Sequence, residues 1–318
     1  MRPPDLGRDQ RRLLRAATVA GGAEGLAATA LPLLAAGLTR DPLAVAGVVV
    51  AQHLPWALTA LIGPASVGSS DGRTVLGLVD SVRAMAAGVL GLLALTGSET
   101  ILVLQATAFV IGLGEALTDL VEADATDVVA VPGQVDGAEG TAVGGMVGAV
   151  VGLAAGGLLY ELVSALPLLM DVPAFALAAL LALSLRRPVA RRGAARPSTG
   201  PGSTAGRRAV MGVAALGTAA TGAVLGVLVL FALDDLGLGA PAFGLLLAGL
   251  AVSTALGGLV APELGRLVGV RGGLVGAMAV TGSAHLAAAL LADPVRPALS
   301  VVALGAAAGA AMAAGVLA

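Results

Sequence analysis

Ionisable and amide side chains lie inside apolar stretches of this 318-residue chain, where such groups are costly and therefore functional candidates. Glu24 lies in the middle of the first stretch, and Gln52 and His53 lie in the middle of the second. A carboxylate and an imidazole at similar depth could exchange a proton in a medium of low dielectric constant. We hypothesise that the three form a substrate- or proton-coupling site. The alternative is structural: Glu24 would face cavity water or a helix break at Gly21-Gly22, and His53 would bond to nearby backbone.

A second set of charges has helical spacing. Asp80 and Arg83 are three residues apart, and Glu115 and Asp119 are four apart, so each pair shares a helix face. An Arg this deep in an apolar stretch needs a carboxylate partner. The four side chains therefore predict an ion-pair cluster. It would be either a static cluster that holds helices together or a gate whose pairing changes with conformation.

A stripe of glycines lines one face of a third apolar stretch. Gly144, Gly148, Gly152 and Gly156 are spaced four apart, and Gly157 is adjacent. Helices in lipid associate through close backbone approach, so the stripe predicts a groove in which another helix packs.

Two further polar residues have structural interpretations. Asp171, two residues before Pro173, is expected to cap the N-terminus of a helix at the extracellular side. His285 is alone in its apolar stretch and is expected to be a structural histidine.

Several kinds of chemistry are disfavoured. The chain has no Cys and two His, so neither a metal centre nor a cysteine nucleophile is expected. Its Gly-rich segments lie inside apolar stretches and not after a strand, which disfavours a phosphate-binding loop, a nucleotide cofactor and ATP-driven transport. The Arg residues form no single basic face, which disfavours a nucleic-acid partner. We expect no enzyme activity and no cofactor.

These residues are set in an all-α membrane protein. The chain is 57% hydrophobic and 12% charged, whereas a soluble domain has about 25% charged residues. Apolar runs of roughly 20 residues are long enough to cross a bilayer as helices. We expect about ten such spans, at Leu13–Leu38, Leu43–Ile62, Thr74–Leu95, Ile101–Val121, Thr141–Leu162, Leu166–Leu185, Ala209–Leu233, Ala242–Val260, Gly273–Leu291 and Pro297–Ala318.

The basic residues predict the orientation. All 18 are Arg, and with the N-terminus in the cytoplasm only Arg40 and Arg296 lie outside. The positive-inside rule thus favours a multi-pass protein of the cell membrane with a cytoplasmic N-terminus. The connection between the fourth and fifth spans is acidic and contains no Arg. Arg, Pro, Gly and Ser dominate residues 187–208, which we interpret as a cytoplasmic linker between a six-helix bundle, residues 1–186, and a four-helix bundle, residues 209–318.

Local segments, together with the order of six helices, linker and further helices, resemble the major facilitator superfamily, and within it the multidrug and siderophore exporters similar to enterobactin exporters. The resemblance covers nearly the whole chain. The matching segments are Ala30-Leu31-Pro32-Leu33-Leu34, residues 38–47, Leu54-Pro55-Trp56, Asp80-Ser81-Val82-Arg83-Ala84, residues 112–119, Asp171-Val172-Pro173-Ala174-Phe175, Leu185-Arg186-Arg187-Pro188 and residues 236–246. The glycine stripe also resembles the superfamily's antiporter motif, with Leu153 where that motif has proline.

The resemblance implies a secondary active transporter that exports a small amphipathic molecule by alternating access, driven by protons. Its partners would be the lipid bilayer, the substrate and protons, and we expect a monomer. Two departures leave an alternative open, a non-transporting or vestigial membrane scaffold. Gly68 and Ser69 replace the acid and base of the family's cytoplasmic latch, with Asp71-Gly72-Arg73 after them. Ten spans instead of twelve suggest a truncated C-terminus.

Overall fold

The computed structural model describes residues 3–62, 71–129, 137–185, 224–290 and 304. These residues are helical apart from short connections and include no strand, which confirms an all-α fold. The chain divides into two compact units, Met1–Ser198 and Thr199–Ala318. The expected linker at 187–208 and the latch positions Gly68 and Ser69 lie outside the described residues.

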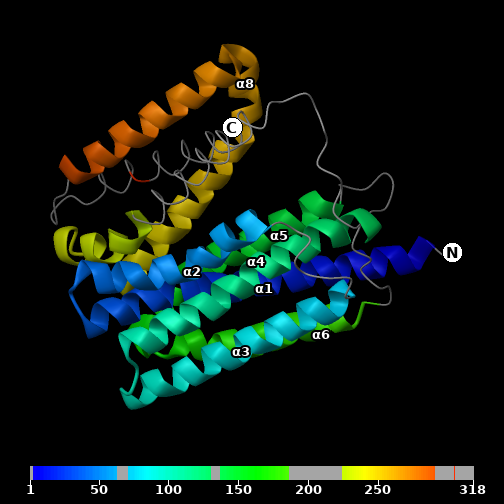
Figure 1. Cartoon of the computed structure of the whole chain (residues 1–318), viewed down its shortest axis with the longest axis horizontal. Coiled ribbons are helices and arrows are strands. Elements are labelled where there is room, and N and C mark those ends of the chain that lie inside the picture. Colours follow the sequence, from blue (N-terminus) through cyan, green and yellow to red (C-terminus); the bar gives the residue numbers. More distant parts are fainter. Residues whose placement is uncertain (1–2, 63–70, 130–136, 186–223, 291–303, 305–318) are drawn as a thin grey trace. The chain divides into compact units, whose positions relative to one another are not determined.

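The described part of the first unit contains six helices, which Figure 1 labels. They are α1 (Pro3–Leu38), α2 (Pro42–Ile62), α3 (Gly72–Thr96), α4 (Ile101–Val129), α5 (Gly137–Leu162) and α6 (Leu166–Leu183). α1 and α4 extend furthest beyond the expected spans. α1 begins at Pro3 because proline is tolerated in the first helical turn. α4 continues past Val121 to Val129, so part of the expected acidic loop is helix. In both cases the helix does not end where the apolar run ends.

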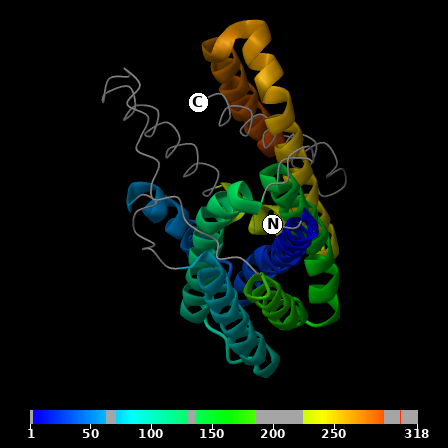
Figure 2. The ribbon, with the colours of Figure 1, turned by 90° about the vertical axis from the view of Figure 1, so that its right-hand side faces the viewer.

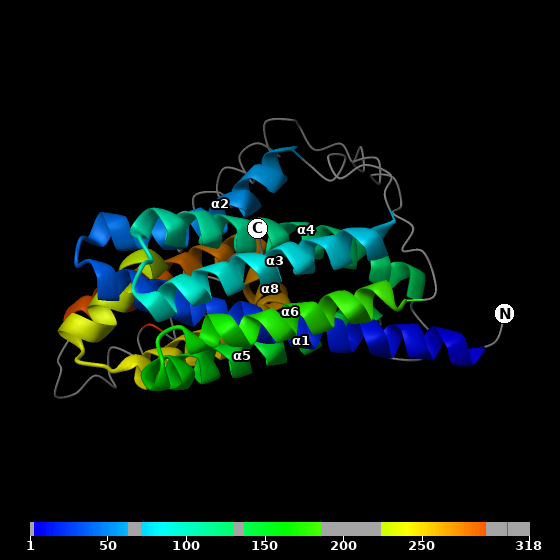
Figure 3. The same cartoon turned by 90° about the horizontal axis from the view of Figure 1, so that it is seen from below.

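α1 is the central helix of this unit. It contacts α2, α4, α5 and α6, while α3 packs on α6 and α4, and α2 packs on α4. Figures 2 and 3 show these helices running side by side along the first unit. The apolar span of α1 is 78% buried, against 39% in α3. A side chain on α1 can therefore meet groups from most of the bundle.

The helices place polar groups inside and apolar groups outside. On α3, Asp80 and Arg83 belong to the buried face, whereas Leu78 and Leu92 are 64% and 60% exposed. This arrangement suits a hydrocarbon solvent, in which exposed leucine costs nothing and polar groups must pair internally. By length and composition six described helices can cross a membrane, namely α1, α3, α4, α5, α6 and the first arm of α8. α2 is not among them, because its apolar part is shorter. The chain is a multi-pass membrane protein.

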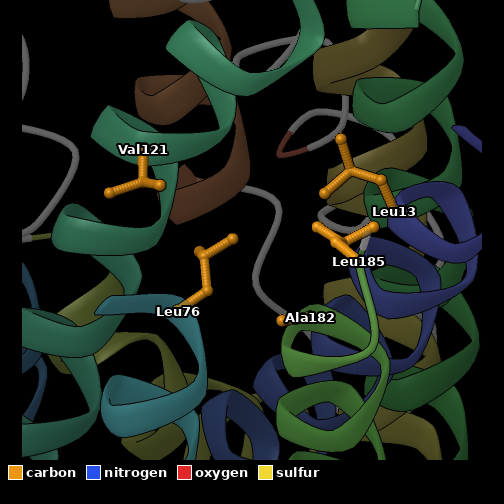
Figure 4. Packing of buried hydrophobic residues seen from close by; sticks show 5 residues of the cluster. All are labelled: Leu13, Leu76, Val121, Ala182 and Leu185. Carbon is orange, nitrogen blue, oxygen red and sulfur yellow. The ribbon is translucent and has the colours of Figure 1, made fainter. Parts of the chain in front are cut away.

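A small apolar cluster lies at the end of the first unit where α1 and α3 begin. Leu13, Leu76, Val121, Ala182 and Leu185 come from α1, α3, α4 and the end of α6 (Figure 4). All five are at most 3% exposed. The polar side chains lie further along the bundle, about three turns after Leu13 on α1 and one to two turns after Leu76 on α3.

The second unit contains a helical segment at 224–230, a π-helical turn η2 (Phe231–Asp235) and α8 (Ala240–Leu290). α8 is bent at Gly269, whose φ of 76° and ψ of 155° are not helical. Its two arms correspond to the expected eighth and ninth spans, and the bend replaces the expected loop. Most of the expected seventh span, and all of the tenth except Leu304, lie outside the described residues.

Candidate functional site

Arg83 of α3 lies at the centre of the first unit, and its side chain has no exposed surface. Gly114 of α4 makes room for it. A β-carbon at Gly114 would lie 2.4 Å from Arg83 Cδ, far closer than van der Waals contact. A buried guanidinium needs acceptors for its N–H groups, so its surroundings decide whether the site is stable.

Three carboxylates from three helices surround this guanidinium. Glu24 of α1 accepts a hydrogen bond from Arg83 Nη2 at 2.6 Å. Asp80, one turn before Arg83 on α3, accepts from Nη1 at 3.3 Å. Glu115 of α4 lies 3.8 Å from Nη2. One positive charge therefore holds together three acidic groups, which leaves an excess of negative charge as long as all three are ionised.

Phe175 of α6 covers the guanidinium. Its ring centroid lies 4.1 Å from Arg83 Cζ, within the range of a cation–π contact. Phe175 is fully buried and packs with Ala23 and Ala84. The ring excludes water from this side of the guanidinium, which strengthens the ion pairs on the other side.

Gln52 extends the network to α2. Its Nε2 donates to Glu115 Oε1 at 3.2 Å, and the residue is 6% exposed. The close approach of the two helices depends on Gly112, where a β-carbon would lie 1.8 Å from the Gln52 carbonyl oxygen. We call the set Glu24, Gln52, Asp80, Arg83, Glu115 and Phe175 the Arg83 cluster. The Arg83 cluster combines members of the two polar sets that the sequence analysis treated separately, the predicted coupling site and the predicted ion-pair cluster.

His53 does not belong to the Arg83 cluster. Its Nδ1 lies 2.9 Å from the carbonyl oxygen of Val49 in its own helix, which is the structural role considered as the alternative. Glu24 pairs with Arg83 instead, and its side chain is 30% exposed. α1 is continuous through Gly21-Gly22, so Glu24 caps no helix break.

Two other acidic residues differ from expectation. Asp119 lies one turn after Glu115 but is exposed, and it makes no ion pair with the described part of the chain. Asp171 is not an N-cap. α6 begins at Leu166 with Ala165 as its cap, so Asp171 lies within the helix, where it is completely buried. The interpretation from Pro173 was wrong because proline is accommodated inside α6.

The glycine stripe faces α1. β-carbons at Gly148 and Gly152 would lie 2.0 Å from the carbonyl oxygens of Thr18 and Gly22, respectively. Gly144 and Gly156 also face side chains of α1, at 2.6 Å from Leu14 Cδ1 and 2.9 Å from Thr29 Cβ, and Gly157 is buried. From the other side, Gly21 and Gly25 of α1 approach the carbonyl groups of Gly145 and Ala149. We call this contact the α1–α5 seam.

The second unit contains an apolar cavity of about 140 Å³. His285 is the single titratable residue in its lining, and its Nδ1 lies 2.8 Å from the Thr281 carbonyl oxygen of the same helix. The other lining residues are Val224, Val227, Leu228, Phe231, Ala288 and Leu304. Among the described residues, no group of three or more His, Asp or Glu side chains could hold a metal ion.

The sequence did not reveal Gly112, Gly114 or Phe175 as parts of the cluster. The two glycines precede Glu115 in Gly112-Leu113-Gly114-Glu115, and glycines beside an intramembrane acid were a usable signal for close packing. Nothing in the sequence pairs Phe175 with Arg83, because that contact depends on how α6 packs against α3.

Comparison with known proteins supports the fold. No family model and no curated protein matches the chain. Among solved structures, a bacterial homologue of the human lysosomal transporter Spinster, inward-facing and occupied, shares 15% identity at a TM-score of 0.69, over 100% of this chain and 74% of that one. The nucleoside transporter NupG shares 15% identity at a TM-score of 0.73, over 97% and 80%.

A bacterial homologue of the iron transporter ferroportin, in an inward-facing state, gives a TM-score of 0.69 at 15% identity, over 96% of this chain and 81% of that one. At these identities the likeness concerns the fold. The chain has the helical-bundle fold of these solved transporters.

Proposed function

We propose that the chain is a secondary active transporter of the major facilitator type. It exports a small amphipathic molecule in exchange for protons, as a monomer in the cell membrane with its N-terminus in the cytoplasm. In this proposal residues 1–186 and 209–318 are the two bundles and residues 187–208 link them. The Arg83 cluster carries the proposal, because a fully buried guanidinium with three carboxylates is costly to maintain and has the composition of a proton-binding site.

Glu24 is the proposed proton-coupling residue. It makes the shortest ion pair to Arg83, and unlike Asp80 it keeps 30% of its side chain exposed. A proton on Glu24 removes its charge and so weakens its hold on Arg83. Because Glu24 belongs to α1 and Arg83 to α3, protonation changes the energy of contact between two helices.

Glu115 and Gln52 transmit this change to α2 and α4. The Gln52 side chain donates to the same Glu115 oxygen that lies 3.8 Å from Arg83, so loss of the Glu24 pair strengthens the pull of Arg83 on Glu115. The cluster thereby acts as the gate considered from the sequence. The α1–α5 seam, similar to the antiporter motif, would keep α1 and α5 together while the gate changes.

The test is proton-linked transport by the full chain in liposomes loaded with a pH-sensitive dye. Ethidium, carboxyfluorescein and Nile red serve as cationic, anionic and neutral amphipathic probes. We expect one of them to cause proton flux, and Glu24→Gln and Arg83→Ala to reduce that flux at least tenfold. The control is Glu161→Gln, because Glu161 is exposed at the end of α5.

A second function, a non-transporting membrane scaffold, is favoured by the complete burial of Arg83, which also suits a static cluster. Under that function no probe would cause proton flux, and Glu24→Gln and Arg83→Ala would change stability alone. That result would overturn the transport proposal.

A further inference from the structure

Asp171 is the most unusual group in the first unit. Asp171 has no exposed surface. Neither of its carboxylate oxygens has a hydrogen-bond partner among the described residues. An isolated, ionised carboxylate in such a site is so costly that the group takes a proton and becomes neutral. Asp171 lies within α6, so no helix terminus compensates its charge.

A second buried group lacks a partner, and it is complementary to the first. Arg83 donates through Nη1 and Nη2, but its Nε–H has no acceptor in the part of the chain that is described. The guanidinium thus retains an unused donor, while Asp171 retains two unused acceptors. Buried polar groups are nearly always paired, so two unpaired ones in the same bundle need an explanation.

The packing of α6 on α3 brings the two groups to the same side. Phe175, whose ring lies on the guanidinium, follows Asp171 by one helical turn and shares its face of α6. Val172 lies opposite α3 as well, at 3.2 Å from the position of a β-carbon at Gly88. Asp171 is therefore on the face of α6 that meets the helix of Arg83.

The charged groups that influence Asp171 are Arg83 and Glu24. α6 packs against α1, α3 and α5. α3 also contributes Asp80, which already pairs with Arg83. Glu161 lies at the exposed end of α5. Arg12 of α1 lies at the other end, where it donates to the carbonyl of Ser184. Arg83 is thus the cation available to Asp171.

We propose that Asp171 is a second proton-binding residue and the alternative counter-ion of Arg83. In the arrangement described, Arg83 pairs with ionised Glu24 and Asp171 is a neutral acid. In the other arrangement Glu24 is neutral, and Arg83 pairs with ionised Asp171. The O–H bond broken at Asp171 is matched by the one formed at Glu24, so these two carboxyl groups together hold one proton in both arrangements.

The two positions of that proton differ in their access to water. The Glu24 side chain is 30% exposed, whereas Asp171 is completely buried. Exchange of partners by Arg83 would therefore move the bound proton between an accessible and an occluded carboxyl group. The exchange of counter-ions extends the proposed proton coupling, and its biological role rests on the proposed function.

The test is infrared spectroscopy of the full chain in nanodiscs at neutral pH, where a protonated carboxylic acid gives a separate carbonyl band. We expect the wild type to show this band and Asp171→Asn to lose one component of it. We also expect Glu24→Gln to lose the same component, because Arg83, released from Glu24, ionises Asp171. Glu161→Gln is the matched control and keeps the band.

A band that is unchanged in Asp171→Asn, or unchanged in Glu24→Gln, overturns the inference. A purely structural Asp171 would keep its proton in Glu24→Gln, so that variant decides the question even if Asp171→Asn does not fold. The measurement is independent of transport. Loss of the Asp171 component in Glu24→Gln without any proton flux in liposomes would support the inference and contradict the proposed function. Proton flux with an unchanged band would support the proposed function and contradict the inference.

Discussion

Two Arg residues of this chain have the same local arrangement and opposite surroundings. Arg83 pairs with Asp80 at i−3 and is fully buried, whereas Arg266 pairs with Glu263 at i−3 with side chains 76% and 64% exposed. The exposed pair has the shorter distance, 2.8 Å against 3.3 Å. Distance nevertheless does not set the energy, because solvent screens the exposed pair and desolvation dominates the buried one.

The first stability prediction follows from this contrast. Arg83→Leu leaves Glu24, Asp80 and Glu115 without their common cation, so we expect a loss of about 3–5 kcal/mol in unfolding free energy. Arg266→Leu should cost less than about 1 kcal/mol. Thermal unfolding of both variants in detergent measures the difference. Equal unfolding midpoints would show that the Arg83 cluster does not hold the bundle together.

At the scale of helices, the α1–α5 seam is the most extensive contact in the described part of the first unit. It is formed by glycines from both helices, and Thr29 Oγ1 adds a hydrogen bond to the Leu153 carbonyl at 3.0 Å. Tyr160 donates to the carbonyl of Leu33 at 3.2 Å near the other end. Close backbone approach maximises dispersion contacts, which replace the hydrophobic effect as the main attraction between helices in lipid.

The seam gives a matched pair of glycine variants on α5. Gly148→Ala places a β-carbon 2.0 Å from the Thr18 carbonyl oxygen, whereas Gly140→Ala meets nothing within 4 Å. We expect Gly148→Ala to lower the unfolding free energy by about 1–3 kcal/mol through overpacking. Gly140→Ala should be neutral or gain up to about 1 kcal/mol from helix propensity. Unfolding in detergent checks both, and an unaffected Gly148→Ala would place α5 away from α1.

At the scale of the molecule, the apolar solvent of the membrane determines which side chains lie outside and which lie inside. Large apolar side chains such as Leu78 and Leu102 are exposed, and the buried face of α3 contains a charge cluster. The Arg residues predict the orientation in the membrane. Ser98, after α3, and Ser184, at the end of α6, are exposed at opposite ends of the first unit.

Because the chain has no Cys, single cysteines report this orientation without background. In whole cells, a membrane-impermeant maleimide should label Ser98→Cys at least tenfold more than Ser184→Cys, since the proposed orientation places the first outside and the second inside. Both should react after the membrane is permeabilised, which controls for side-chain access. The opposite labelling would reverse the predicted orientation.

The sequence by itself determined the class of fold and most helix positions. Length and apolarity of the runs are local properties, and the bilayer sets the length that a helix needs to cross it. Helix ends were less predictable, as α1 and α4 show, because a helix continues through polar residues until its backbone is interrupted. The bend at Gly269 was missed for a related reason, since the bend requires one residue of positive φ and no polar loop.

Tertiary structure alone decided which polar residues meet. The sequence placed Glu24 with His53 and Arg83 with Asp80, and both pairs had suitable depth or spacing. Only the packing of α1 and α3 against α4 and α6 brings Glu24 to Arg83. Only the rotation of α2 turns Gln52 toward Glu115 and His53 toward its own backbone. Spacing along one helix fixes which residues share a face, but the contacts of that face depend on the neighbouring helices.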